Sequence, residues 1–224
     1  MLTALCKSLT LFLLLGIARN LASGTRELQE PPQGSADSHC PEQYLPPGVR
    51  GDASLLPVVL CSLEEPSLLD SAAQDANLVS FRVSYFAPVP THKVAVRLVV
   101  NADGSGQVTS AVSSGTTTGV KRTRGNVSKA EVDGLVQLME KVGFWSMASI
   151  DSPEPKTDKA GRKMIEFDGA WWMLEGVKKG SFHYVFRRNP KPSPVMEIGC
   201  YLAKDLVKSD GAAIPMPGCA EHKS

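Results

Sequence analysis

Residues 171–188 read WWMLEGVKKGSFHYVFRR, and the pairing of this stretch decides the fold. Large apolar residues recur at every second position on both sides of residues 178–180, a pattern typical of two antiparallel strands joined by a tight turn. Gly180 suits the left-handed position of a three-residue loop with a bulge, and that loop fixes which residues lie opposite each other. One side of the hairpin then carries the residues that we expect in the core: Trp172, Leu174, Phe182, Tyr184 and Phe186.

The opposite side of this hairpin is a candidate binding surface. The three-residue loop places Glu175 across from His183, where a carboxylate holds the imidazole in one tautomer, as a general base needs. It also places Trp171 across from Arg187, which gives either a stacked pair that supports the sheet or a platform for a ligand. A cross-strand polar pair worth about 0.2–1 kcal/mol explains the same residues. We therefore predict a binding role for these four side chains and assign no catalytic residue.

We predict neither a metal site nor a cofactor site. A metal would need a third ligand beside His183 and Glu175, and the other three histidines lie in unrelated segments. The cysteines form no C-x-x-C pair. The stretch 115–125, GTTTGVKRTRG, combines glycines with three cations, but it lacks the spacing of a phosphate-binding loop. We expect it to be a solvated connection.

The chain before the hairpin shows the same alternation of apolar and polar residues. Apolar residues recur at every second position over residues 79–85 and again over residues 94–100. A turn at residues 101–104 leads into a returning segment over residues 107–112. These three segments predict an antiparallel meander.

A helix is predicted after this meander. Ser128 and Glu131 have the spacing of a capping box, and Gly143 suits a left-handed cap at the other end. Between these limits, apolar residues fall on one helical face. They are Val132, Leu135, Val136, Met139 and Val142.

The same order recurs in the second half of the chain. Strands over residues 164–167, 170–177 and 181–188 precede a helix that begins after Ser193. Two units of three strands and one helix predict an α+β domain over residues 78–208, with an antiparallel sheet and helices packed on one face.

The first 24 residues, MLTALCKSLTLFLLLGIARNLASG, predict export. Lys7 precedes an apolar run over residues 9–17, and small residues follow the run, as in a secretory signal peptide. The run is about half of the roughly 20 residues that a membrane-spanning helix needs, so we expect cleavage and a secreted or periplasmic product without a membrane anchor. Loss of Lys7 and Arg19 with this segment changes the formal charge from +1 to −1, which gives no reason to expect nucleic acid as a partner.

Four cysteines remain after residue 24: Cys40, Cys61, Cys200 and Cys219. An even number in an oxidising compartment predicts two disulfides. Three connectivities are open, and the spacing favours pairing each cysteine with its neighbour in the sequence. Each bond would close a loop of about 20 residues and stabilise the fold by roughly 3 kcal/mol.

Two further segments flank the α+β domain. Residues 25–77 form an arm rich in proline and glycine, with a short helix expected over residues 62–73. Residues 209–224 form a C-terminal tail that Cys219 attaches to the preceding helix.

Several short segments resemble a family of predicted secreted bacterial proteins. They are Glu65-Pro66-Ser67-Leu68, Phe144-Trp145, Asp168-Gly169 leading into Trp172-x-Leu174-Glu175-Gly176, and His183-Tyr184-Val185-Phe186-Arg187 with Pro190 soon after. The resemblance spans about residues 65–208. It implies a bacterial source and a location in the periplasm or outside the cell, and it brings no activity.

Together these features predict a non-catalytic function. An antiparallel sheet with one mixed polar and aromatic face suits recognition of a protein, a glycan or an envelope component. The alternative from a different class is a small secreted hydrolase that uses Glu175 and His183 as base and orienter. A structural envelope protein is the third possibility.

Overall fold

The computed structural model describes residue 40 and residues 43–49, 51–88, 91–115, 119–150, 169–188 and 192–207, together with residues 214, 216, 218 and 219. The predicted signal peptide and the predicted strand over residues 164–167 lie outside these residues.

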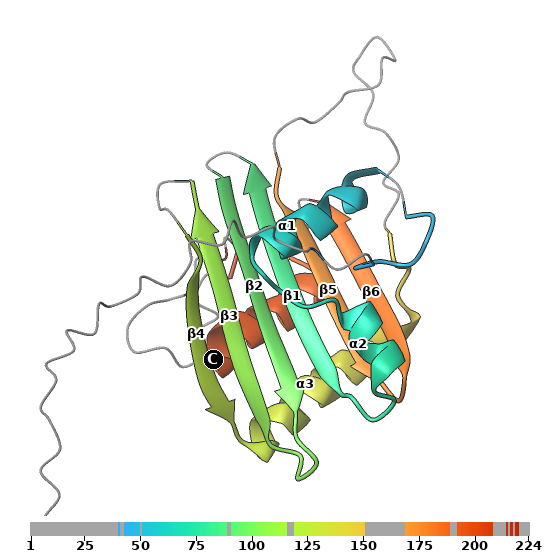
Figure 1. Ribbon diagram of the computed structural model, residues 1–224. Helices are drawn as coiled ribbons and strands as arrows, with labels where there is room; N and C mark the ends of the chain where they lie inside the picture. Colours follow the sequence, from blue (N-terminus) through green and yellow to red (C-terminus); the bar gives the residue numbers. More distant parts are fainter. Residues whose placement is uncertain are drawn as a thin grey trace, which may run out of the picture. The chain divides into compact units, whose positions relative to one another are not determined.

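Within the described chain, six strands form one antiparallel sheet in the order β4-β3-β2-β1-β5-β6 (Figure 1). The strands are β1 (Ser80–Pro88), β2 (Thr91–Val100), β3 (Gly106–Ser114), β4 (Lys121–Val127), β5 (Trp171–Lys178) and β6 (Ser181–Arg188). The helices are α1 (Leu56–Ser62), α2 (Leu68–Gln74), α3 (Lys129–Lys141) and α4 (Pro194–Cys200). Short 3₁₀ turns lie at Gly51–Leu55 and Phe144–Ser146, and a π-helical segment, Tyr201–Leu206, continues α4. The predicted α+β class with an antiparallel sheet is confirmed.

The first unit of the sheet holds four strands, where three were predicted. The stretch 115–125 was expected to be a solvated connection, but its residues from Lys121 onward belong to the edge strand β4 (Lys121–Val127), which pairs with β3. The sequence KRTRGNV has polar residues on both of its faces, so it lacks the apolar alternation that signals a half-buried strand. An edge strand needs only one neighbour, and charged side chains are common on such strands.

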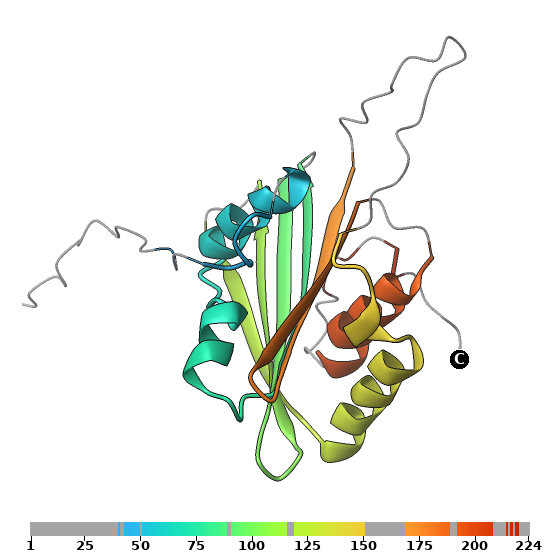
Figure 2. The ribbon, with the colours of Figure 1, turned by 90° about the vertical axis from the view of Figure 1, so that its right-hand side faces the viewer.

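Helices lie on both faces of the sheet (Figure 2). The two predicted helices, α3 and α4, share one face and bury Val83, Leu98 and Leu174 there. On the other face, α1 packs over Ala95 and Met173. The prediction for residues 78–208, an antiparallel sheet with its helices packed on one face, therefore agrees with the positions of α3 and α4, and the helices on the second face come from outside that range. The proline-rich arm supplies the two extra helices, and they cover apolar side chains that β5 carries on this second face as well.

The residues predicted at the two ends of α3 are confirmed. Ser128 and Glu131 form the predicted capping box of α3, and Gly143 adopts the left-handed conformation with φ 69°. The arm forms two helices rather than one, because Pro66 lies between them and a helix ends readily before a proline. The Ser67 hydroxyl caps α2 by accepting a hydrogen bond from the backbone N–H of Asp70 at 3.0 Å.

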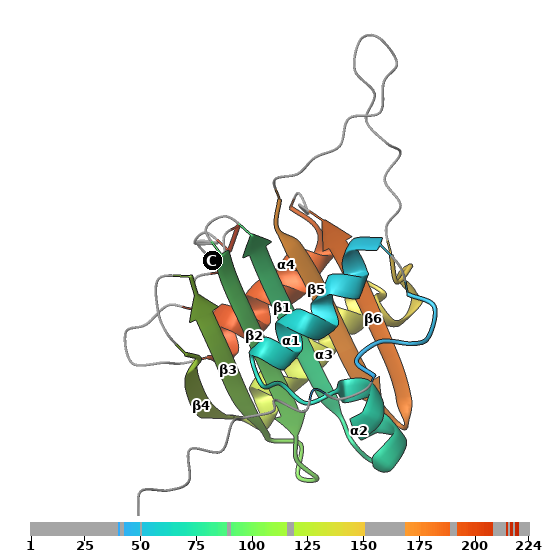
Figure 3. The same cartoon turned by 45° about the horizontal axis from the view of Figure 1, so that its top comes forward.

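The arm covers only part of its sheet face. Figure 3 shows α1 crossing the strands, with α2 beside β5 and β6. Towards the end of β2 and the start of β3, and along β4, the residues on this face are partly or fully exposed. They are Arg97, Val99, Gln107, Thr109, Arg122, Arg124 and Asn126.

Both predicted disulfides are confirmed. Cys40 is bonded to Cys61, and Cys200 is bonded to Cys219, with 5.3 Å between the Cα atoms in each pair. Such bonds are typical of proteins that fold in an oxidising environment. Among the described residues, no helix has the length and apolar character needed to cross a bilayer.

Candidate functional site

The hairpin between β5 and β6 turns over two residues, not three. Lys178 pairs with Ser181, so that Lys179 and Gly180 alone make the reversal, with φ angles of 54° and 71°. Positive φ at both positions is typical of the two-residue turn that matches the twist of a β-hairpin. The predicted three-residue loop is therefore wrong, and every pair along the hairpin is shifted by one residue.

This shift separates the predicted Glu–His pair. Glu175 lies opposite Tyr184, whereas His183 lies opposite Gly176. Successive residues of a strand point to opposite faces, so a shift of one residue moves a side chain through the sheet. Glu175 consequently projects towards the arm, and His183 projects towards α3.

The predicted pair of Trp171 and Arg187 is also separated. Trp171 lies opposite Arg188, whose guanidinium is 5.8 Å from the centre of the indole ring. The indole is buried and stacks on Phe86 with 5.2 Å between ring centroids. Arg187 lies on the other face and donates to the carbonyl oxygens of Phe186 at 2.7 Å and Ala148 at 3.1 Å. Trp171 is thus not an exposed platform.

Glu175 is one half of a buried ion pair with Arg82. The guanidinium meets the carboxylate with two prongs, Nε to Oε2 at 2.6 Å and Nη2 to Oε1 at 2.6 Å. Nη1 donates to the carbonyl oxygen of Pro66 at 2.6 Å, and both charged side chains are fully buried. Burial raises the pKa of Glu175, and the charge and hydrogen bonds of Arg82 oppose that shift. Burial also disfavours the charged form of Arg82, but the two carboxylates beside it keep its pKa above the ordinary value.

Glu65 extends this pair into a network. Its carboxylate lies 3.7 Å from Nη1 of Arg82, 3.1 Å from Nε of Arg97 and 3.5 Å from Nη1 of Arg122. Arg122 also donates to the carbonyl oxygen of Leu63. The network therefore attaches the turn between α1 and α2 to strands β1, β2 and β4.

His183 occupies an aromatic setting on the α3 face. Its ring lies 5.0 Å from the ring of Phe144 and 6.1 Å from that of Trp145. Burial lowers the pKa of His183, and the backbone of Phe144 and Met147 opposes the shift. Nε2 is buried and has no hydrogen-bond partner within the described chain. The imidazole is therefore packed among aromatic rings on this face.

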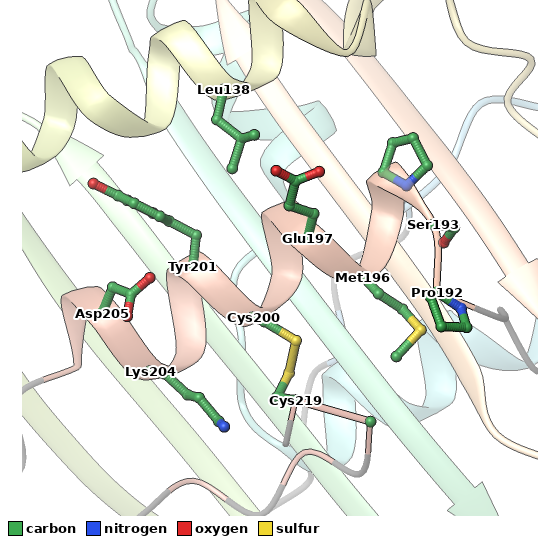
Figure 4. Close-up of a pocket in the computed structure, with 12 residues that line it drawn as sticks. Leu138, Pro192, Ser193, Met196, Glu197, Cys200, Tyr201, Lys204, Asp205 and Cys219 are labelled. Atoms are coloured by element: carbon green, nitrogen blue, oxygen red, sulfur yellow. A yellow bond between two sulfur atoms is a disulfide. The ribbon is translucent and has the colours of Figure 1, made fainter. Parts of the chain in front are cut away.

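A groove of about 990 Å³ lies along the outer side of α4 (Figure 4). One part of its lining is apolar, with Leu138 from α3, Pro192, Pro194 and Met196, and the Cys200–Cys219 disulfide. Five further lining residues have polar side chains, and Gly218 completes the lining. The five are Ser193, Glu197, Tyr201, Lys204 and Asp205.

The polar side of the groove favours binding over chemistry. Burial raises the pKa of the Tyr201 phenol, and the nearby carboxylates of Asp205 and Glu131 add to that shift, so the hydroxyl stays protonated. The Ser193 hydroxyl is buried and finds no hydrogen-bond partner among the described residues. A buried hydroxyl of this kind is a candidate contact for a ligand.

Sequence reasoning missed Arg82, Glu65 and the groove. One signal was present: Trp171 and Met173 are apolar, as are Trp172 and Leu174 on the opposite face, and such a continuous run indicates a strand buried on both faces. A charged residue on a neighbouring strand would then need a buried partner. Arg82 joins two distant segments of the chain, because it contacts both Pro66 and Glu175.

Comparison of the chain with protein-family models, with curated proteins and with solved structures gives no match.

Proposed function

We propose that the protein is an exported, disulfide-stabilised module that binds a protein, glycan or envelope component without changing it chemically. The observation that carries the proposal is the groove along α4, whose apolar lining ends beside carboxylates and a buried hydroxyl. Concave apolar sites with a few convergent polar groups are the usual form of a binding site. Glu197 and Asp205 suit a ligand that offers a cation or hydrogen-bond donors next to an apolar body.

The hydrolase alternative required Glu175 and His183 to lie together, and they do not. Glu175 is neutralised by Arg82 and points away from His183, so the two cannot act together as base and orienter. His183 is packed against aromatic rings and does not line the groove. These contacts favour binding without turnover.

Site-specific photo-crosslinking tests this function. A photo-reactive amino acid replaces Lys204, which is exposed at the groove, and in a matched variant it replaces Val58, which is 67% exposed on α1. Each disulfide-bonded protein is irradiated in the envelope fraction of the source organism. We expect one dominant adduct from position 204 and none of the same mass from position 58.

The captured molecule is then purified and incubated with the wild-type protein. Reversible binding with an unchanged ligand mass supports the proposal. A ligand that is cleaved points to the hydrolase, and equal adducts from both positions rule out the groove as the binding surface.

A further inference from the structure

One row of cross-strand neighbours runs across the whole sheet on the arm's face. The pairs are in direct register from β6 to β4. In order, the row is Tyr184, Glu175, Arg82, Arg97, Thr109 and Arg124. Arg122 lies two residues from Arg124 on the same face of β4. Neighbouring strands are about 4.8 Å apart, so Arg97, Arg122 and Arg124 originate within roughly 10–12 Å of one another.

We name these three residues, Arg97, Arg122 and Arg124, the arginine face. The arm neutralises them unequally. Arg97 contacts the buried carboxylate of Glu65, and 22% of its side chain stays exposed. Arg122 contacts Glu65 as well as Glu64, and 40% of its side chain is exposed. Arg124 is exposed, and its side chain makes no hydrogen bond or ion pair within the described chain.

The turn at Glu64 and Glu65 places two carboxylates of the chain itself against this surface. Glu65 is buried by the arginines, whereas the Glu64 side chain is 76% exposed and reaches Arg122 at 3.1 Å. Glu64 adopts φ 52°, a left-handed conformation that is energetically unfavourable for any residue other than glycine. Glu64 is the left-handed residue that ends α1, since the backbone N–H groups of Glu64 and Glu65 donate to the carbonyl oxygens of Cys61 and Leu60. This helix cap places consecutive carboxylates against the guanidinium groups.

We infer that the arginine face binds an acidic segment of a partner protein, with Arg124 and the exposed parts of Arg97 and Arg122 as its contacts. Planar guanidinium groups match carboxylates with two parallel hydrogen bonds. The chain's formal charge of +1, or −1 without the predicted signal peptide, gives little long-range attraction for a nucleic acid. A second copy of the chain would bring like charges together.

Glu64 has a defined place in this binding mode. Its exposed carboxylate competes with the partner for Arg122, because both need the same guanidinium group. Removal of the Glu64 charge should tighten binding, whereas reversal of the Arg124 charge should weaken it. Two surface substitutions thus have opposite expected effects.

The test uses a fluorescein-labelled oligoglutamate peptide and the disulfide-bonded protein at low ionic strength, with affinity measured by fluorescence anisotropy. Arg124→Glu should weaken binding about tenfold or more, because it removes a charge-assisted contact and adds repulsion. Glu64→Gln should tighten binding about threefold. Lys141→Glu is the matched control, since Lys141 is exposed at the end of α3 on the other side of the sheet, and it should change affinity less than about twofold.

Three outcomes overturn the inference. They are no binding of oligoglutamate by the wild type, equal weakening by Arg124→Glu and Lys141→Glu, or Arg124-dependent binding of oligogalacturonate in place of oligoglutamate. Thermal melts verify that each variant is folded. The arginine face and the groove lie on opposite sides of the sheet, so a negative result here leaves the crosslinking test at position 204 unaffected.

Discussion

Arg82 and Glu175 are 93 residues apart in the chain and meet in a two-pronged ion pair inside the protein, with both hydrogen bonds at 2.6 Å. The pair joins β1 to β5 on the face that the arm covers. Arg82 also holds the carbonyl oxygen of Pro66, so the same guanidinium fixes the arm to the sheet. The carboxylate expected to serve His183 therefore has a structural role.

Removal of one partner from this pair should be costly. Arg82→Met or Glu175→Gln alone should lower the free energy of unfolding by about 3–5 kcal/mol, because the remaining charge stays buried without its partner. The double variant should cost about 2–3 kcal/mol less than the sum of the two. Urea unfolding of all four proteins measures this coupling, and strictly additive losses would contradict it.

The exposed pair of Lys129 and Asp133 is the control for this experiment. Its atoms are 2.7 Å apart, but 63% and 48% of the two side chains are exposed. Asp133→Asn should cost only about 0.3–0.5 kcal/mol, as is usual for such helix pairs.

The hairpin turn offers a stabilising substitution. Lys179 adopts φ 54°, which asparagine tolerates better than lysine, and Asn-Gly is the preferred sequence for this turn. Lys179→Asn should raise the free energy of unfolding by about 0.5–1 kcal/mol. Lys178→Asn, at a strand position, should not. Thermal unfolding separates the two, and a loss of stability in Lys179→Asn would show that the lysine side chain contributes more than its backbone strain costs.

The same turn shows what could not be predicted from the sequence. Gly180 indicated a reversal, but a lysine at positive φ is unusual, so the three-residue loop was the natural expectation. That one-residue difference reverses the facing of every side chain in β6 relative to β5. The Arg82–Glu175 pair was beyond prediction for a different reason, since no local pattern links residues so far apart.

Local sequence patterns were sufficient to predict α3 and the strands β1, β2 and β3. The capping box at Ser128 and the left-handed Gly143 fixed the limits of α3, because each depends on contacts within a few residues. Alternation predicted β1, β2 and β3, whose inner faces are mostly apolar. It failed for β4, whose inner face carries Lys121 and Thr123, and the groove depends on segments that only the fold brings together.

His183 should make stability depend on pH. Burial lowers its pKa in the folded protein below the ordinary value of about 6.5, so the unfolded chain binds the proton more readily. The stabilisation is complete above about pH 6.5 and is lost as the pH falls towards the folded-state pKa. His183→Phe keeps an aromatic ring without a titrating group. The wild type should lose unfolding free energy relative to the variant from pH 7 to pH 5, and a constant difference would show that the pKa of His183 is the same in the folded and unfolded states.

Removing each disulfide in turn gives two variants that can be compared directly. They close loops of similar length, with sequence separations of 21 and 19, so the chain-entropy contribution of each is about 3 kcal/mol. Serine replacement of Cys40 and Cys61, or of Cys200 and Cys219, should therefore lower stability in urea by comparable amounts. Their effects on binding should differ.

Only the Cys200–Cys219 bond lines the groove, and the tail residues Ile214 and Met216 beside it are buried in the core. Its loss should reduce the crosslinking yield at position 204 severalfold at a temperature where both variants are folded. Loss of the Cys40–Cys61 bond, which lies within the arm on the other face, should leave that yield unchanged. Because the two variants lose a similar amount of stability, a lower crosslinking yield in only one of them reflects the changed groove and not general destabilisation. Equal yields would show that the groove is not the binding surface.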